Sequence, residues 1–247
     1  MIAFLTSSPT RELTTEYPDP CLDERNGFVV QLRALWRGGR CLMIAAYPDA
    51  HAQNDEMTDY YRAAVEHSGL EVECFDLWDD RYPALSAQEL HRYDAIFLAG
   101  GHIATQNRWF HHIGLKEKLA GFEGLLIGTS AGSMNSAREV YAWPEEPGEP
   151  GLPMEELFLP GLGLANTVIL PHYQKMKDAV VDGRHLMEDV TCSHSFGRRF
   201  YAVPDGSYVL VRGKREILFG EALLVSDGKI TPFSREGERR VLQGAEE

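Results

Sequence analysis

The chain has 247 residues, 44% of them hydrophobic, and a formal net charge of −13 at pH 7. This length can bury a sizeable core, and we expect one α/β domain over residues 1–247. Because an acidic surface repels phosphate backbones, the composition argues against a nucleic-acid partner and favours a small molecule or peptide.

The sequence gives no indication of a membrane segment, a metal site or a cofactor. The N-terminal stretch MIAFLTSSPT lacks the basic region of a signal peptide, and no apolar run approaches the ~20 residues of a membrane span. The four cysteines form no C-x-x-C pair, and no H-E-x-x-H motif is present. We therefore expect a cytoplasmic protein, a monomer or homodimer, with reduced thiols.

The first half of the chain alternates between short apolar runs and amphipathic segments. The apolar runs predict buried strands at 2–5, 41–46, 72–75, 95–100 and 124–128. Apolar residues at helical spacing predict helices over 54–68 and 105–120. This alternation predicts a mostly parallel sheet with helices on both faces, in which ligands bind beyond the carboxyl ends of the strands.

The second half adds a loop and a set of shorter segments. The stretch AWPEEPGEPGLP (142–153) predicts a loop, TVILPH (167–172) a strand, and residues 178–189 a helix. Between 201 and 233 the turn pairs Asp205-Gly206 and Asp227-Gly228 predict antiparallel hairpins at one edge of the sheet. The expected fold is a three-layer α/β sandwich with these hairpins at its edge.

The pentapeptide GTSAG (128–132) has the G-x-S-x-G form of a nucleophile elbow, at the end of a predicted strand. We expect Ser130 to be the nucleophile. Backbone N–H groups can stabilise the oxyanion that forms when a serine attacks a carbonyl. Ala131, directly after the serine, and Gly101, after the strand AIFLAG, are the expected donors.

A serine nucleophile needs a base, which is usually a histidine oriented by a carboxylate. Among the nine histidines, His172 follows the apolar run TVIL and a proline, so it leaves a strand end at the sheet edge expected for Ser130. If the chain order is serine, acid, histidine, the acid lies between 130 and 172, where the chain has glutamates but no aspartate. We favour Glu145, with Glu146 as the alternative on the same loop.

Three sequence blocks resemble one family. LAGGHIATQN (98–107), IGTSAGSMN (127–135) and GLGLANTVILPHY (161–173) are similar to the motifs of the serine peptidases typified by aspartyl dipeptidase (peptidase E) and cyanophycinase. The resemblance implies a class I glutamine amidotransferase-like fold from about residue 40 to 230. It also implies Ser130 as nucleophile, His172 as base, Gly101 as oxyanion donor and Glu145 as acid.

The resemblance further implies a substrate site. The family's Gly-Gly-Asn is Gly-Gly-His here, so we expect His102, Gln106 or Asn107 to take the role of the asparagine. Basic residues beyond the histidine bind the aspartyl carboxylate in aspartyl dipeptidases, and Arg184 is the first choice here, followed by Lys175 and Lys177.

The leading functional hypothesis is a serine peptidase for small peptides, with a possible preference for an acidic N-terminal residue. Two alternatives stay open. The first is a binding or regulatory domain that keeps the fold without peptidase activity, suggested by His102 in place of the asparagine. The second is an esterase of the α/β-hydrolase type, which is disfavoured because no histidine follows His194.

Overall fold

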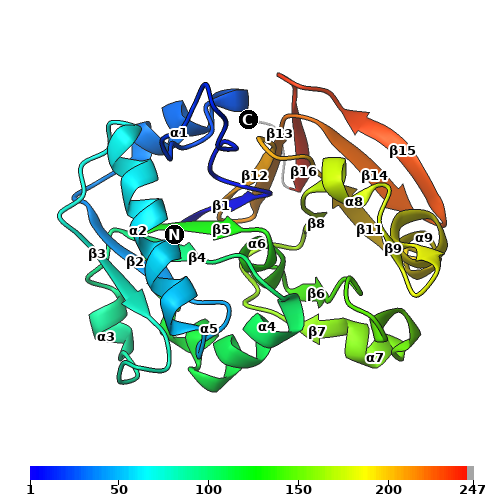
Figure 1. Cartoon of the computed structure of the whole chain (residues 1–247), viewed down its shortest axis with the longest axis horizontal. Helices are drawn as coiled ribbons and strands as arrows, with labels where there is room; N and C mark the ends of the chain where they lie inside the picture. Colours follow the sequence, from blue (N-terminus) through cyan, green and yellow to red (C-terminus); the bar gives the residue numbers. More distant parts are fainter. Residues whose placement is uncertain (244–247) are drawn as a thin grey trace.

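The computed structural model describes residues 1–243, and an eight-stranded central sheet runs through it (Figure 1). Its strands are β1 (Ile2–Thr6), β2 (Arg40–Ile44), β3 (Cys74–Trp78), β4 (Ala95–Leu98), β5 (Leu125–Thr129), β12 (Tyr208–Arg212), β13 (Arg215–Phe219) and β16 (Arg239–Gln243). Their order is β16-β13-β12-β1-β5-β4-β2-β3. Strands β1 to β5 are parallel to their neighbours among themselves, and β12, β13 and β16 extend the sheet antiparallel from β1. The predicted mostly parallel α/β sheet is confirmed.

Helices cover both faces of this sheet (Figure 1). One face packs against α1 (Phe28–Leu35) and α2 (His51–His67), the other against α3 (Ala87–Leu90), α4 (Ile103–His112) and α5 (Leu115–Lys118). Successive strand residues alternate between the faces: in β2, Met43 belongs to the same buried cluster as Phe28, whereas Leu42 belongs to that of Phe110. The helix predicted over 105–120 is interrupted, because Gly114 takes a left-handed conformation (φ 60°) between α4 and α5.

A second sheet stands beside the central one (Figure 1). It contains β8 (Val168–Leu170), β11 (Arg199–Ala202), β14 (Ala222–Ser226) and β15 (Lys229–Ser234), in the order β15-β14-β11-β8. The predicted hairpins therefore do not share one edge: β12 and β13 extend the central sheet, whereas β14 and β15 extend the second. The turn at Asp227 (φ 48°) and Gly228 (φ 76°) joins a true hairpin. The pair Asp205-Gly206 instead carries the chain from β11 in one sheet to β12 in the other.

The segment between the two sheets contains the short helix α6 (Ala131–Asn135), the pair β6 (Glu139–Tyr141) and β7 (Phe158–Pro160), and the loop expected at 142–153 with a single 3-10 turn, η2 (Glu149–Gly151). Buried side chains from α6, β6 and the second sheet form a third cluster that includes Met134, Trp143 and Phe200. This cluster packs the loop and the second sheet against α6.

The helix predicted over 178–189 is wrong for its first half. Residues there form the small hairpin of β9 (Val180–Val181) and β10 (Arg184–His185), since Asp182 (φ 50°) and Gly183 (φ 74°) both take the left-handed conformation of a tight turn. A helical turn, η3 (Leu186–Thr191), follows and leads into α9 (Cys192–His194). Over residues 1–243, no helix combines the length and apolar character needed to cross a bilayer.

Candidate active site

Ser130 lies between β5 and α6 in a strained conformation, with φ 49° and ψ −112°. The glycines on either side allow this sharp strand-to-helix turn. A Cβ atom at Gly128 would lie 2.7 Å from Ser133 Oγ, and one at Gly132 would lie 2.7 Å from Leu98 Cβ. Helix α6 therefore packs directly against β4 and β5, and the turn presents Ser130 as a nucleophile elbow does.

The loop after β4 borders this turn. A Cβ atom at Gly100 would lie 3.5 Å from Ser130 Cβ, whereas one at Gly101 would collide with Ala46 Cβ at 2.6 Å. Among the described residues, the N–H groups of Gly101 and Ala131 donate no backbone hydrogen bond. The two expected oxyanion donors, on the segments after β4 and β5, therefore have no backbone partner in this part of the chain.

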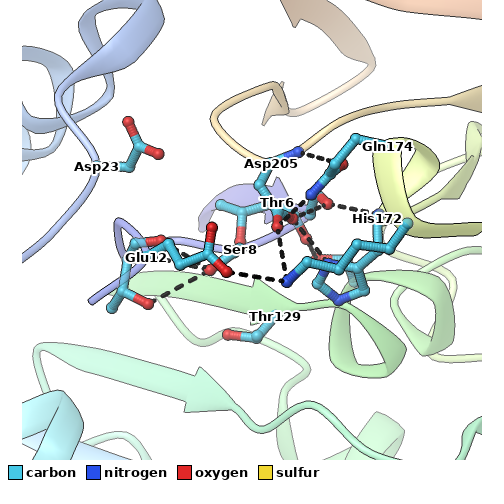
Figure 2. Close-up of polar contacts among 12 residues, drawn as sticks. Thr6, Ser8, Glu12, Asp23, Thr129, His172, Gln174 and Asp205 are labelled. Atoms are coloured by element: carbon cyan, nitrogen blue, oxygen red, sulfur yellow. Dashed lines mark hydrogen bonds and ion pairs between the residues drawn. The ribbon is translucent and has the colours of Figure 1, made fainter. Parts of the chain in front are cut away.

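His172 follows β8 and pairs with a carboxylate that the sequence did not indicate. His172 Nδ1 lies 2.7 Å from Asp205 Oδ1, and the second oxygen, Oδ2, accepts a 2.5 Å hydrogen bond from Gln174 Nε2 (Figure 2). His172 itself takes a left-handed conformation (φ 57°), which turns its side chain out of the strand direction. Since β8 and β11 are parallel, the segments after them, which carry His172 and Asp205, emerge at the same sheet edge.

The surroundings of Asp205 keep it ionised. Burial by itself raises the pKa of this carboxyl, but the hydrogen bond and charge of His172, together with hydrogen bonds from Ser7 and Gln174, lower it to about 2. A permanent negative charge beside Nδ1 fixes the proton on that ring nitrogen and leaves Nε2 free to accept a proton.

Ser7, the residue after β1, forms hydrogen bonds with Ser130, His172 and Asp205. Its carbonyl oxygen accepts the Ser130 N–H at 3.1 Å, and its hydroxyl accepts the His172 N–H at 2.7 Å. The same hydroxyl donates to Asp205 Oδ1 at 2.6 Å, and Ser7 is completely buried. One buried serine at the end of the central sheet therefore sets the nucleophile turn, the histidine and the carboxylate relative to one another.

Glu145, the acid expected from the sequence, has no hydrogen bond or ion pair with His172 among the described residues, although the charge of His172 acts on it. Its carboxylate accepts no hydrogen bond in this part of the chain. The pKa of Glu145 is raised overall. Burial is the main cause and the charge of Glu149 adds to it, whereas the charges of His102 and His172 oppose it. The Trp143 indole donates to Thr191 Oγ1 at the end of η3, which anchors this part of the loop. The alternative Glu146 is exposed.

Asp205 and Ser7 were missed for identifiable reasons. The order serine, acid, histidine places the acid before residue 172, whereas Asp205 follows the histidine in the chain. Asp205-Gly206 also has the composition of a hairpin turn. The signal that could have found both residues is their position: each comes within a few residues of a strand's carboxyl end, where parallel strands place their ligands.

The expected substrate residues are placed differently from one another. His102 lies at the N-terminus of α4 with Nε2 2.7 Å from Glu149 Oε1, so it closes onto the loop. Gln106 is fully buried. Its side-chain amide donates a hydrogen bond to the Ala99 carbonyl and accepts one from Asn135 Nδ2. Asn107 is also buried, and its Nδ2 donates hydrogen bonds to Asn135 Oδ1 and to the Pro160 carbonyl. The amides of Gln106 and Asn107 therefore hold α4 and α6 together beneath the site.

Arg184, on β10, donates to the carbonyl oxygen of Pro150 and so anchors the loop 142–153. No hydrogen bond or ion pair among the described residues links it to His172 or Asp205. Lys175, the next choice in the sequence analysis, has Nζ 3.8 Å from Asp205 Oδ2. Within residues 1–243, no group of three or more His, Cys, Asp or Glu side chains is arranged to hold a metal ion.

This fold and this arrangement define a class: hydrolases that carry a serine on an elbow at the edge of a parallel α/β sheet. The family model of peptidase family S51 matches residues 37–219, and the chain belongs to this family. It is therefore a serine peptidase, a hydrolase, and the resemblance described from the three sequence blocks is confirmed.

Solved structures show the same fold. A peptidase from an acI-B1 actinobacterium is 14% identical with a TM-score of 0.63, and the match covers 98% of this chain and 96% of that one. A putative peptidase E protein from Listeria monocytogenes EGD-e is 17% identical with a TM-score of 0.58, over 88% of this chain and 96% of that one. No curated protein matches the chain.

Proposed function

We propose that this peptidase hydrolyses small peptides through an acyl-enzyme, with Ser130 as nucleophile, His172 as base and Asp205 as the acid that orients it. The observation that carries the proposal is the 2.7 Å contact of His172 with Asp205. Ser7 supports it, because this one residue bonds the backbone of Ser130 and of His172 and the side chain of Asp205. Asp205 replaces Glu145 in this role.

The reaction follows from the roles of these groups. His172 Nε2 takes the proton of the Ser130 hydroxyl while Oγ attacks the scissile carbonyl carbon. The N–H groups of Gly101 and Ala131 stabilise the resulting oxyanion, each contributing about 3 kcal/mol. The imidazolium then gives its proton to the leaving amine, the C–N bond breaks, and water hydrolyses the acyl-enzyme by the same steps.

Substrate preference remains a proposal from the resemblance, with an acidic N-terminal residue as the first choice to test. Nothing in the contacts of Arg184 supports it as the residue that binds such an acid, because the guanidinium is engaged by the Pro150 carbonyl. His102 Nε2 is likewise occupied, by the Glu149 carboxylate, so its contacts do not support a role in binding such an acid either.

Two measurements test the proposed function. The first is labelling of the wild type, Ser130→Ala and the control Ser136→Ala by a fluorophosphonate, which reacts with activated serines; the Ser136 hydroxyl bonds the Gly132 carbonyl within the helix. The second is a mass-spectrometric screen of dipeptides with the same proteins. We expect labelling and cleavage in the wild type and Ser136→Ala, and neither in Ser130→Ala. Cleavage by Ser130→Ala would overturn the assignment of the nucleophile.

A further inference from the structure

An open cleft of about 450 Å³ adjoins the catalytic histidine. Its walls include His172 and Asp205 on one side and residues 8–13 of the N-terminal segment on the other. Figure 2 shows the Glu12 side chain of this segment pointing toward the region where His172 and Asp205 lie. A cleft of this size accommodates a single amino acid residue with room to spare.

The position of the cleft decides which part of a substrate it receives. In the proposed reaction, His172 gives its proton to the leaving amine, so the residue that carries this amine must lie against the imidazole. Because His172 lines the cleft whereas Ser130, Gly101 and Ala131, which hold the acyl part in the proposed reaction, do not, the cleft is placed for the leaving residue rather than for the acyl residue. In a dipeptide the leaving residue ends in a free carboxylate, which a single Cα atom separates from that amine.

The cleft contains cationic groups suited to a carboxylate. Arg11 lines it, and its guanidinium lies 4.3 Å from the centre of the Tyr17 ring. In the described part of the chain Arg11 has no ion pair, and its Nε is buried without a hydrogen-bond partner. Lys175 Nζ lies 3.8 Å from Asp205 Oδ2 and 4.0 Å from Glu12 Oε1, and since the lysine is exposed each contact contributes little. Arg25 also lines the cleft, but Asp23 binds it at two nitrogens.

Arg11 is held in place by its own segment. The Arg11 N–H donates to the Cys21 carbonyl at 3.1 Å, and the Asp23 N–H donates to the Pro9 carbonyl at 2.9 Å. Leu22 is buried, and its N–H donates to Ser68 Oγ, which ties the segment to the end of α2. A guanidinium on an anchored backbone loses little freedom when it binds a ligand. This segment lies outside the residues matched by the family model.

We propose that this cleft is the leaving-residue subsite and that Arg11, assisted by Lys175, binds the free α-carboxylate of that residue. The planar guanidinium can donate two hydrogen bonds to the two carboxylate oxygens, and Lys175 adds a positive charge beside the base. The proposal rests on the proposed function and deepens it, because it makes the free C-terminus of a dipeptide part of what the enzyme recognises.

The experiment compares two matched substrate sets: Xaa-Leu dipeptides over all amino acids, and the same peptides as C-terminal amides. We expect the wild type to cleave the free acids with a kcat/KM roughly 10- to 100-fold above that of the amides, since a charged hydrogen bond is lost in the amide. In Arg11→Gln this preference should collapse, mainly through KM for the free acids, with the amides little changed. Arg11→Lys should restore part of it.

Arg62→Gln is the matched control, because Arg62 lies on the exposed face of α2 and, within residues 1–243, pairs only with Glu66; it should behave as the wild type. Equal cleavage of acids and amides by the wild type overturns the subsite, as does an equal loss on both sets in Arg11→Gln. If Ser130→Ala is inactive in those cases, the proposed function stands while the subsite fails.

Two further outcomes would also overturn the proposal. The first is that the wild type cleaves none of the free dipeptides, even though the fluorophosphonate labels Ser130. Better cleavage of Xaa-Glu amides than of free Xaa-Leu would assign the carboxylate to the side chain of the leaving residue instead of its C-terminus.

Discussion

The Asp205 carboxylate accepts hydrogen bonds from three side chains: His172 Nδ1, the Ser7 hydroxyl and Gln174 Nε2. Two of these donors lie just beyond β8 and the third follows β1, so the carboxylate is fixed in position as well as in charge. A histidine held by such a carboxylate keeps one tautomer and one orientation. By comparison, Glu145 has no such donors among the described residues and sits where burial raises its pKa.

Asp205→Asn should therefore reduce kcat by about 10³- to 10⁴-fold, with KM much less affected, because the neutral amide no longer fixes the tautomer of His172. Steady-state kinetics on the best dipeptide of the screen would measure this effect. Glu145→Gln is the matched variant, and we expect it to lose less than about tenfold. A larger loss in Glu145→Gln than in Asp205→Asn would restore Glu145 as the acid.

At the scale of elements, the position of Ser130 depends on how closely α6 approaches β4. Gly132 makes this approach possible, since a Cβ atom there would lie 2.7 Å from Leu98 Cβ and would also meet the Leu98 carbonyl. Backbone atoms of a central strand cannot move aside as a flexible side chain would. The second glycine of the pentapeptide, two residues after Ser130, is thus required by the packing of the helix on the strand.

Gly132→Ala should push α6 away from the sheet. We expect it to lower the free energy of unfolding by about 2 kcal/mol, although alanine is the better helix former. Activity should fall as well, because Ser130 begins this helix. Thermal unfolding measures the stability, with Gly151→Ala as control, since a Cβ atom at Gly151 meets no other atom within 4 Å. Equal unfolding midpoints for the two variants would contradict this explanation.

At the scale of the whole molecule, the site lies where the two sheets meet. The central sheet provides Ser7 and Ser130 at the ends of β1 and β5, and the second sheet provides His172 and Asp205 beyond β8 and β11. The hydrogen bonds of Ser7 with His172 and Asp205 cross this junction. These side chains therefore also contribute to the contact between the two sheets, and the charge state of Asp205 affects the stability of the fold.

This contribution predicts a pH dependence of stability. The pKa of Asp205 falls from its ordinary value of 3.8 to about 2 in the folded protein, so its ionised form favours folding. The effect, about 2 kcal/mol, is complete above about pH 4 and is lost as the pH falls toward 2. Denaturant unfolding should show Asp205→Asn less stable than the wild type at pH 7, with the difference disappearing near pH 2. A difference that stays constant with pH would exclude this linkage.

The parallel α/β core, the strand-to-helix turn at Ser130 and the position of His172 beyond a strand end could all be predicted from the sequence alone. These features are local: apolar runs, the glycines around Ser130, and the proline before His172 act within a few residues of where they stand. The contact of Asp205 with His172, the hydrogen bonds of Ser7 and the cleft beside Arg11 required the tertiary structure. Asp205 has the local composition of a turn, and only the parallel pairing of β8 with β11 places it beside His172. Contacts between residues far apart in the chain depend on strand order and sheet assignment, and no local pattern of residues encodes these.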